Sequence, residues 1–185
     1  MPLLRRPRLT RTDWLIAGLE ALCEIGPGAL GAEPLARRIG TTKGSFYWHF
    51  NDVPAYHQAI LDLWAAEAEA TLTTASEAAT DTSRLRDTAQ TIAASAQNDA
   101  AAMRAESAIR AWAQDDPAAA AAVQAVDERR LQRLHALLSA CGIGNIEMAR
   151  ILYAAAIGMQ ALRDRDADRN AAAIGSLVDL VLALR

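Results

Sequence analysis

The residues best suited to chemistry lie in one short stretch, TTKGSFYWHF, from Thr41 to Phe50. Four of the nine aromatic residues of the chain fall within its last five positions, beside hydroxyl and imidazole groups. Apolar side chains contact thymine methyl groups in the major groove, and hydroxyl or imidazole groups bind phosphate oxygens. The stretch therefore has the groups needed to contact a nucleic acid.

Helical geometry divides these aromatic residues into two sets. Phe46 and Phe50 are four residues apart, so steps of about 100° per residue place both on one side, which we predict to be core. Roughly opposite or on the flanks are the other candidates: Gly44, Ser45, Tyr47, Trp48 and His49. We expect Trp48 to point outward. The alternative is that Trp48 packs beneath another part of the chain.

The residues around this stretch carry the start and stop signals of short helices. The segment TRTDWLIAGLEALCEIG opens with a Thr-x-x-Asp capping pattern and closes with a glycine. Pro34 suits the first turn of a second helix that ends at Gly40, and Thr42 can cap a third over Lys43 to about His49. Two short helices joined by a tight turn with a glycine form a helix-turn-helix.

Composition predicts an all-α globular protein with an uneven charge. The chain has 185 residues, of which 52% are apolar and 5% aromatic, and its alanine-rich runs favour helix over sheet. The net charge is −3, but the first fifty residues have seven basic and four acidic side chains, a net +3. The rest of the chain therefore carries −6. This split suggests that the first fifty residues meet a polyanion, unless it arises by chance.

Other classes of protein find little support in the sequence. No apolar run approaches the length of a membrane span, and no apolar region follows the first arginines, so we expect a cytoplasmic protein without a membrane partner. The cysteines Cys23 and Cys141 have no partner at metal-ligand or CxxC spacing, and we expect both to be small buried hydrophobes.

An enzyme is not expected either. The three histidines lie outside any metal-ligand motif, and the sequence contains no GxSxG, P-loop or GxGxxG pattern. Glu106 and Arg110 are four residues apart, which is typical of an ion pair on a helix surface. We therefore expect no catalytic residues, no metal and no cofactor.

The segment EPLARRIGTTKGSFYWHFND resembles the DNA-binding signature of the tetracycline-repressor (TetR) family of bacterial transcriptional regulators. Its YWH triplet is similar to that of the founding repressor. The resemblance covers about Thr10 to Leu63 and joins LARRIG, GSFYWHF and the flanking helices, a specific combination. RAWAQDDPAAAAAVQAVDERR is similar to the middle of many actinobacterial members, which adds weaker support.

The resemblance implies a palindromic double-stranded DNA operator as partner. The residues it implies to approach base edges are Lys43, Gly44, Ser45 and Trp48. Those it implies to hold phosphates are Thr42, Tyr47 and His49. The basic arm, Arg5, Arg6 and Arg8, would follow the DNA backbone or enter the minor groove. Val53 stands where the family usually has a lysine, so one phosphate contact is in doubt.

The last two helices, expected over about Ile146 to Leu162 and Asn170 to Leu184, have small residues on an apolar face. The residues that share this face are Ile151, Ala155, Gly158 and Leu162 on the first helix, and Ala171 and Gly175 on the second. Small residues let helices approach closely. In the resembled family the final two helices of each subunit form the interface of a homodimer. The alternative is a helix pair that closes its own monomer.

The resemblance also implies two domains and a small-molecule effector. We expect a helix-turn-helix DNA-binding domain over residues 1–52 and a larger helical domain for effector binding and dimerisation over residues 53–185. The candidate pocket residues are Trp64, Met103, Trp112 and Tyr153, although each suits plain core equally well. The implied function is a repressor that its effector releases from DNA. The alternative is a helical small-molecule carrier or sequestering protein whose helix-turn-helix no longer functions.

Overall fold

A computed structural model describes residues 9–75, 80–95, 99–162 and 167–183, and these ranges are helical, with no strand. This confirms the all-α prediction. The elements, in chain order, are α1 (Arg11–Glu24), the short 3₁₀ helix η1 (Pro27–Ala29), α2 (Ala32–Arg38), α3 (Lys43–Phe46), α4 (Val53–Ala75), α5 (Asp81–Ala93), α6 (Ala101–Arg104), α7 (Glu106–Trp112), α8 (Pro117–Ala140), α9 (Ile146–Gln160) and α10 (Ala167–Leu182). Within the described ranges, no helix combines the length and apolar character that a membrane span requires.

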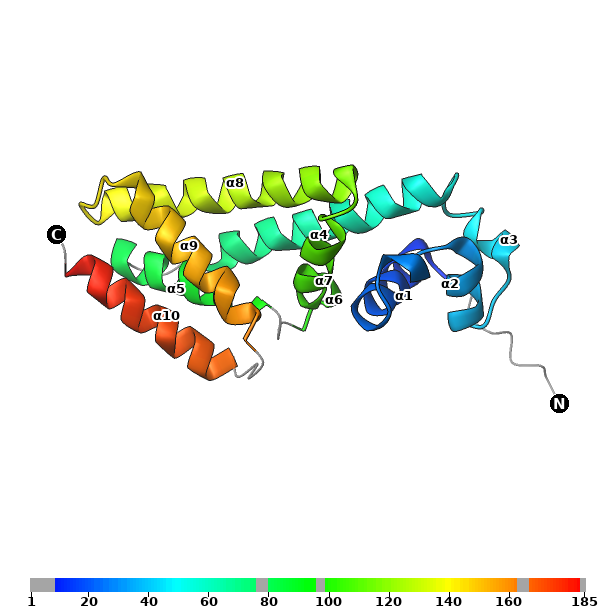
Figure 1. Cartoon of the computed structure of the whole chain (residues 1–185), viewed down its shortest axis with the longest axis horizontal. Coiled ribbons are helices and arrows are strands. Elements are labelled where there is room, and N and C mark those ends of the chain that lie inside the picture. The colour runs from blue at the N-terminus through cyan, green and yellow to red at the C-terminus, as the bar shows by residue number, and fades with distance from the viewer. Residues whose placement is uncertain (1–8, 76–79, 96–98, 163–166, 184–185) are drawn as a thin grey trace.

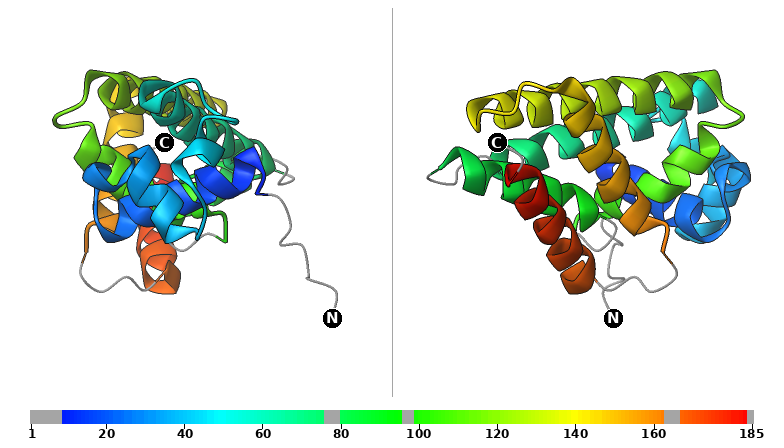
Figure 2. Two further views of the ribbon diagram at one scale, coloured as in Figure 1. Left: turned by 90° about the vertical axis from the view of Figure 1, so that its right-hand side faces the viewer. Right: turned by 60° about the vertical axis from the view of Figure 1, so that its left-hand side comes forward.

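The molecule is elongated, with the short helices α1 to α3 at one end (Figure 1). The long helix α4 leads from this end into the rest of the chain and packs along α8. At the opposite end, α10 packs on α5 and α9, and α9 packs on α8 (Figures 1 and 2). The pair α6 and α7 lies between the two ends, where α6 contacts α1 and α4 and α7 contacts α8.

Two hydrophobic cores hold these helices together. The first runs without interruption from α1, α2 and α3 into α4, α6, α7 and the start of α8. The second joins the end of α4 to α5, α8, α9 and α10. The expected boundary between residues 52 and 53 stays a prediction, and the first core is continuous across it.

An aromatic cluster centred on Phe46 builds the first core. Phe46 is fully buried, and its ring centroid lies 5.4 Å from that of Trp14, 5.2 Å from Phe50 and 5.1 Å from Tyr56. These residues come from α1, the turn after α3, and α4. Phe46 and Phe50 are core, as predicted, because their spacing turns both toward α1 and α4.

Three expected helices differ in extent from the sequence prediction. The third ends at Phe46 rather than near His49, because the chain tightens there into a turn in which the His49 amide donates to the Phe46 carbonyl over 3.0 Å. The sequence also predicts one continuous helix over about Ala100 to Trp112, but the chain is interrupted at Ala105 and forms α6 and α7. This break sets Glu106 at the start of α7. The last helix begins at Ala167 rather than near Asn170.

The expectation that both cysteines are buried is wrong for Cys23, which is exposed, whereas Cys141 is buried. The cause is the orientation of α1. Its buried face is centred on Trp14, Gly18 and Leu22, and steps of about 100° per residue carry Cys23 past the edge of this face to the solvent-facing side.

A close approach at Gly18 joins α1 to α4. The Tyr56 hydroxyl of α4 donates to the Trp14 carbonyl of α1 over 2.7 Å, and Tyr56 is fully buried. A Cβ atom added to Gly18 would lie 1.9 Å from this hydroxyl oxygen and 2.9 Å from Ile60 Cδ1. Because both neighbours are core residues, neither has room to retreat, and α4 is held against α1.

We predict that Gly18→Ala lowers the free energy of unfolding by about 1–3 kcal/mol, because overpacking outweighs the better helix propensity of alanine. Urea denaturation monitored by circular dichroism measures this change. Gly28→Ala is the matched control, since nothing lies within 4 Å of its added Cβ. Equal stability of Gly18→Ala and the unmodified chain would contradict the close approach.

Candidate nucleic-acid interface and ligand cavity

The helix-turn-helix presents one compact exposed group of side chains. Thr42 caps α3, with its hydroxyl accepting from the Ser45 amide over 3.4 Å. With Phe46 and Phe50 turned inward, Trp48 is left 81% exposed and Tyr47 46% exposed. Trp48 therefore packs under no described part of the chain, which excludes the alternative position considered from the sequence.

The predicted DNA-contacting residues are gathered unevenly. Thr42, Lys43 and Gly44 are exposed beside Tyr47 and Trp48. Ser45 and His49 are half-buried and accessible only in part. The basic arm, Arg5, Arg6 and Arg8, lies outside the described residues. The arrangement offers an ammonium group, hydroxyl donors and an indole N–H, which suit phosphates and base edges.

Other charged residues near this surface hold the fold. Arg38 on α2 donates to both carboxylate oxygens of Glu24 on α1, at 2.8 and 2.7 Å. This bidentate pair fixes the angle between α1 and α2. Val53, the departure from the family pattern, is half-buried at the start of α4 and packs against the first core. Its side chain is thus used in packing.

The structure does not bring the four predicted pocket residues together. Trp64, Met103 and Trp112 are at most 5% exposed and belong to the first core. Tyr153 belongs to the second core and lines a separate cavity. A ligand role for these residues stays a prediction.

The cavity beside Tyr153 has a volume of about 650 Å³ and opens to solvent between α7, α8 and α9. Its lining residues are Arg110, Asp127, Leu131, Arg150, Ile151, Tyr153, Ala154, Ile157 and Gly158. Small-molecule sites typically have about 300–1,000 Å³ and a mostly apolar lining with a few polar groups. The cavity fits this description.

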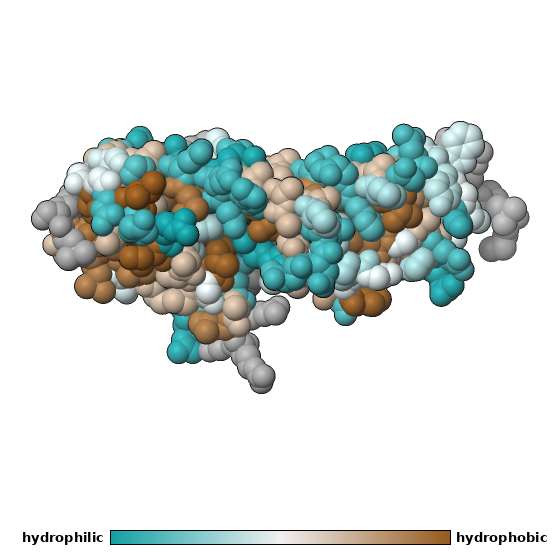
Figure 3. All heavy atoms as spheres, turned by 45° about the horizontal axis from the view of Figure 1, so that its top comes forward, coloured by the Kyte–Doolittle hydropathy of each residue, from teal (hydrophilic) through white to brown (hydrophobic). Residues whose placement is uncertain are grey.

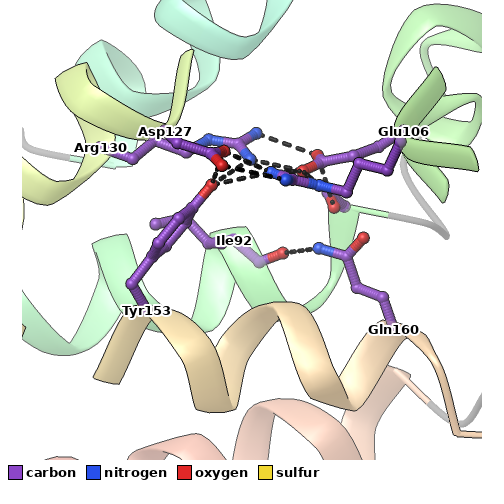
Figure 4. Close-up of polar contacts among 8 residues, drawn as sticks. Ile92, Glu106, Asp127, Arg130, Tyr153 and Gln160 are labelled. Carbon is purple, nitrogen blue, oxygen red and sulfur yellow. Dashed lines mark hydrogen bonds and ion pairs between the residues drawn. The ribbon is translucent and has the colours of Figure 1, made fainter. Parts of the chain in front are cut away.

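A buried ion network forms the polar wall behind the cavity (Figure 4). Glu106 is fully buried and accepts from Arg130 at 2.5 and 3.0 Å, and Arg130 is itself 1% exposed. Arg110 also donates to Glu106, at 2.9 Å, and to Asp127, at 2.7 Å. The Tyr153 hydroxyl donates to Asp127 over 2.6 Å and accepts from Arg110 over 2.8 Å. Two arginines thus balance two carboxylates.

Burial and charge set the protonation of this network. Burial raises the pKa of the Tyr153 hydroxyl to about 12, so it stays protonated at neutral pH and can donate to Asp127. Burial would lower the pKa of Arg130, but the hydrogen bonds and charge of Glu106 outweigh that effect and raise it. The pKa of Arg110 is raised in the same way, chiefly through Asp127.

The sequence expectation of a surface ion pair at Glu106 and Arg110 is wrong, because α7 packs on α8 and covers Glu106. Asp127 and Arg130, three residues apart, form the other half of the network. The sequence did contain a signal for burial, namely apolar residues at helical spacing from Glu106 and from Arg130. Glu106 lies three residues before Ile109 and Arg130 four residues after Val126, so each of these charged residues is on the same helix face as a core residue.

Part of the predicted dimer face is exposed. Ile151 and Leu162 are 49% and 50% exposed, and Gly158 is exposed with nothing within 4 Å of an added Cβ. Ala155 is half-buried. Apolar surface gathers at the end of the molecule that carries α8, α9 and α10 (Figure 3).

The small residues of α10 serve a different contact. Gly175 is buried, and an added Cβ would lie 2.8 Å from Gln90 Nε2 and 3.0 Å from Arg86 Nη1 of α5. The Ala171 carbonyl accepts from Gln90 over 2.8 Å. This differs from the expectation, because α5 fills the space that we expected a second subunit to use.

The buried network predicts a large effect of Glu106→Gln. Without the carboxylate charge, the buried Arg130 loses its counterion, and we expect the free energy of unfolding to fall by about 3–5 kcal/mol. Urea denaturation at neutral pH measures the loss. Glu128→Gln is the control, because Glu128 is exposed on the same helix as Arg130. Similar stabilities of the two variants would mean that Arg130 does not depend on Glu106.

No protein-family model and no curated protein matches the sequence. Solved structures nevertheless share its fold. A transcriptional regulator from Rhodococcus sp. Rha1 has a TM-score of 0.78 at 17% identity, covering 95% of this chain and 97% of its own. A TetR transcription regulator from Haloarcula marismortui has 0.74 at 16%, covering 94% and 97%. The superantigen PfiT has 0.71 at 17%, covering 97% of each chain. The chain therefore has the fold of the TetR-family transcriptional regulators.

Proposed function

We propose that this protein is a sequence-specific DNA-binding transcriptional regulator. The observation that carries the proposal is the exposed Trp48 and Tyr47 pair, held on a rigid helix-turn-helix next to Lys43. An indole that is 81% exposed costs solvation free energy unless a partner covers it. The positive charge of the first fifty residues makes DNA the partner that fits.

Selection of random duplexes by the purified full-length protein tests this proposal. We expect enrichment of a palindrome with half-sites about one helical turn, 34 Å, apart, because two recognition helices must reach successive major grooves. Recovery of unenriched duplexes at low salt would reject sequence-specific regulation.

The proposed regulator is a homodimeric repressor that a small effector releases from its operator. Residues 1–52 would bind DNA, and residues 53–185 would bind the effector and the second subunit. The placement of α6 and α7 supports such coupling, because they contact α1 on one side and α8 on the other. An effector that favours a different arrangement of these helices would change the spacing of the recognition helices and weaken DNA binding.

A second candidate function is binding or sequestration of a small molecule without DNA. The cavity of about 650 Å³ favours it. A fold alone does not fix function, and PfiT, which shares this fold, is described as a superantigen. The duplex selection separates the two candidates, because a carrier would enrich no sequence.

Trp48→Ala should weaken binding to the selected duplex by roughly 1–3 kcal/mol and relax the preference at one base position, because the indole would contact a base edge. Repeating the selection with the variant measures both effects. Ile25→Ala is a suitable control, since Ile25 is also exposed, at 72%, but lies at the far end of α1. An unchanged motif and affinity would remove Trp48 from the reading residues.

Gly158→Arg should convert the proposed dimer to monomers, because a long charged side chain cannot fit a close helix crossing. Sedimentation velocity at micromolar concentration measures the change. Among the described residues, nothing lies within 4 Å of a Cβ atom added to Gly158. Gly144→Arg, in the turn between α8 and α9, adds the same charge in open space and should remain dimeric. Dimers of Gly158→Arg would place the interface elsewhere.

A further inference from the structure

We propose that the cavity between α7, α8 and α9 binds a small amphipathic anion, an apolar body with one carboxylate or similar group, whose charge is held by Arg110 and Arg150. Only the role of this anion as an effector rests on the proposed function. Binding itself requires only the cavity.

The charges that line the cavity do not cancel. Asp127 accepts from Arg110 and from Tyr153, so its negative charge is already compensated. Glu106 lies behind the wall and is matched by Arg130. Arg150 is different, because it is 68% exposed and its carboxylate neighbour, Glu147, lies 3.9 Å away and is 66% exposed. Exposed ion pairs of this kind contribute little. The lining residues Arg110, Arg150 and Asp127 therefore carry a net charge of +1, which the exposed Glu147 outside the lining offsets only weakly.

Arg110 has a donor to spare. A guanidinium carries five N–H groups. Its Nε and Nη2 donate to Glu106, Asp127 and Tyr153, while Nη1 donates only to Asp127 among the described residues, over 3.2 Å. One Nη1 N–H thus has no acceptor there. The side chain lines the cavity and is 20% exposed, and we therefore expect an incoming anionic oxygen to bind this N–H without breaking the network.

The remaining lining residues select an apolar body. Leu131, Ile151, Ala154 and Ile157 offer only hydrocarbon to the cavity. A cationic ligand would meet Arg110 and Arg150, and a wholly polar ligand would leave this surface wet. An anion with a hydrocarbon tail satisfies both parts of the lining.

The site also borders the predicted dimer face. Ile151 and Gly158 line the cavity and belong to the exposed face of α9. A second subunit on this face would cover the open side of the cavity. Ligand binding and dimerisation would then be thermodynamically linked, because each would favour the other.

Calorimetric titration of the full-length protein without DNA tests the proposal with three probes of equal chain length: decanoate, decanol and decyltrimethylammonium. Decanoate and decyltrimethylammonium are kept below their micelle concentrations, and decanol below its solubility limit. We expect decanoate to bind at least about tenfold more tightly than the other two, a difference of about 1.4 kcal/mol. Equal affinities, a preference for the cation, or no binding of decanoate would overturn the proposal.

Two pairs of variants locate the site. Arg150→Gln should weaken decanoate binding by about three- to tenfold and leave decanol unchanged, since one exposed charge contact contributes up to about 1 kcal/mol or slightly more. Arg129→Gln, which removes an exposed arginine outside this cavity, should have no effect. Ala154→Trp should block the cavity, whereas Ala136→Trp, exposed on α8 outside it, should bind normally. Unaltered decanoate binding by Ala154→Trp would place the ligand elsewhere.

Because these titrations contain no DNA, their outcome is independent of the outcome of the duplex selection. Decanoate binding without an enriched duplex would support the site and reject the regulator. An enriched duplex without decanoate binding would support the regulator and reject this ligand class.

Discussion

The packing of Phe46 constrains the whole amino-terminal end of the molecule. Its ring contacts aromatic residues from α1, from the turn after α3 and from α4, and Tyr56 adds a hydrogen bond to the backbone of α1. Once these rings fill the interior, Tyr47 and Trp48 have no buried place. The same contacts that make the helix-turn-helix rigid therefore force its largest side chain into solvent. Because an indole has only two side-chain torsions, an exposed tryptophan on a packed backbone binds a partner with little loss of conformational entropy.

The buried network plays the corresponding part in the rest of the chain. Glu106 and Arg130 are removed from water and depend on each other for charge balance, while Arg110 and Asp127 extend the pairing toward the cavity. Such groups stabilise a fold only in the right geometry. The network thus fixes the position of α7 relative to α8 and α9. The preceding helix, α6, contacts α1. A ligand at the edge of this network would therefore act on α7. Together, α6 and α7 contact α1 at one end of the molecule and α8 on the other side.

The sequence predicted the elements whose signals are local. Helical spacing located Phe46 and Phe50 in the core, and the all-α class followed from alanine-rich composition. The network was missed, because the pair at Glu106 and Arg110 looks the same on a buried as on an exposed helix until its neighbours are known. Gly175 was assigned to a partner subunit for a related reason: a small residue predicts a close contact but not which helix makes it. The ligand cavity depends on three helices and has no local signal.

We propose that the fold holds Trp48 outward to contact DNA, and tryptophan fluorescence can measure this contact. Trp14, Trp64 and Trp112 are at most 5% exposed, so Trp48 should supply the emission that acrylamide quenches. With a saturating amount of the selected duplex, we predict that this quenchable component disappears while the buried emission persists. A component that remains equally quenchable in the saturated complex would contradict a DNA contact by Trp48, because the indole would then still be exposed to solvent.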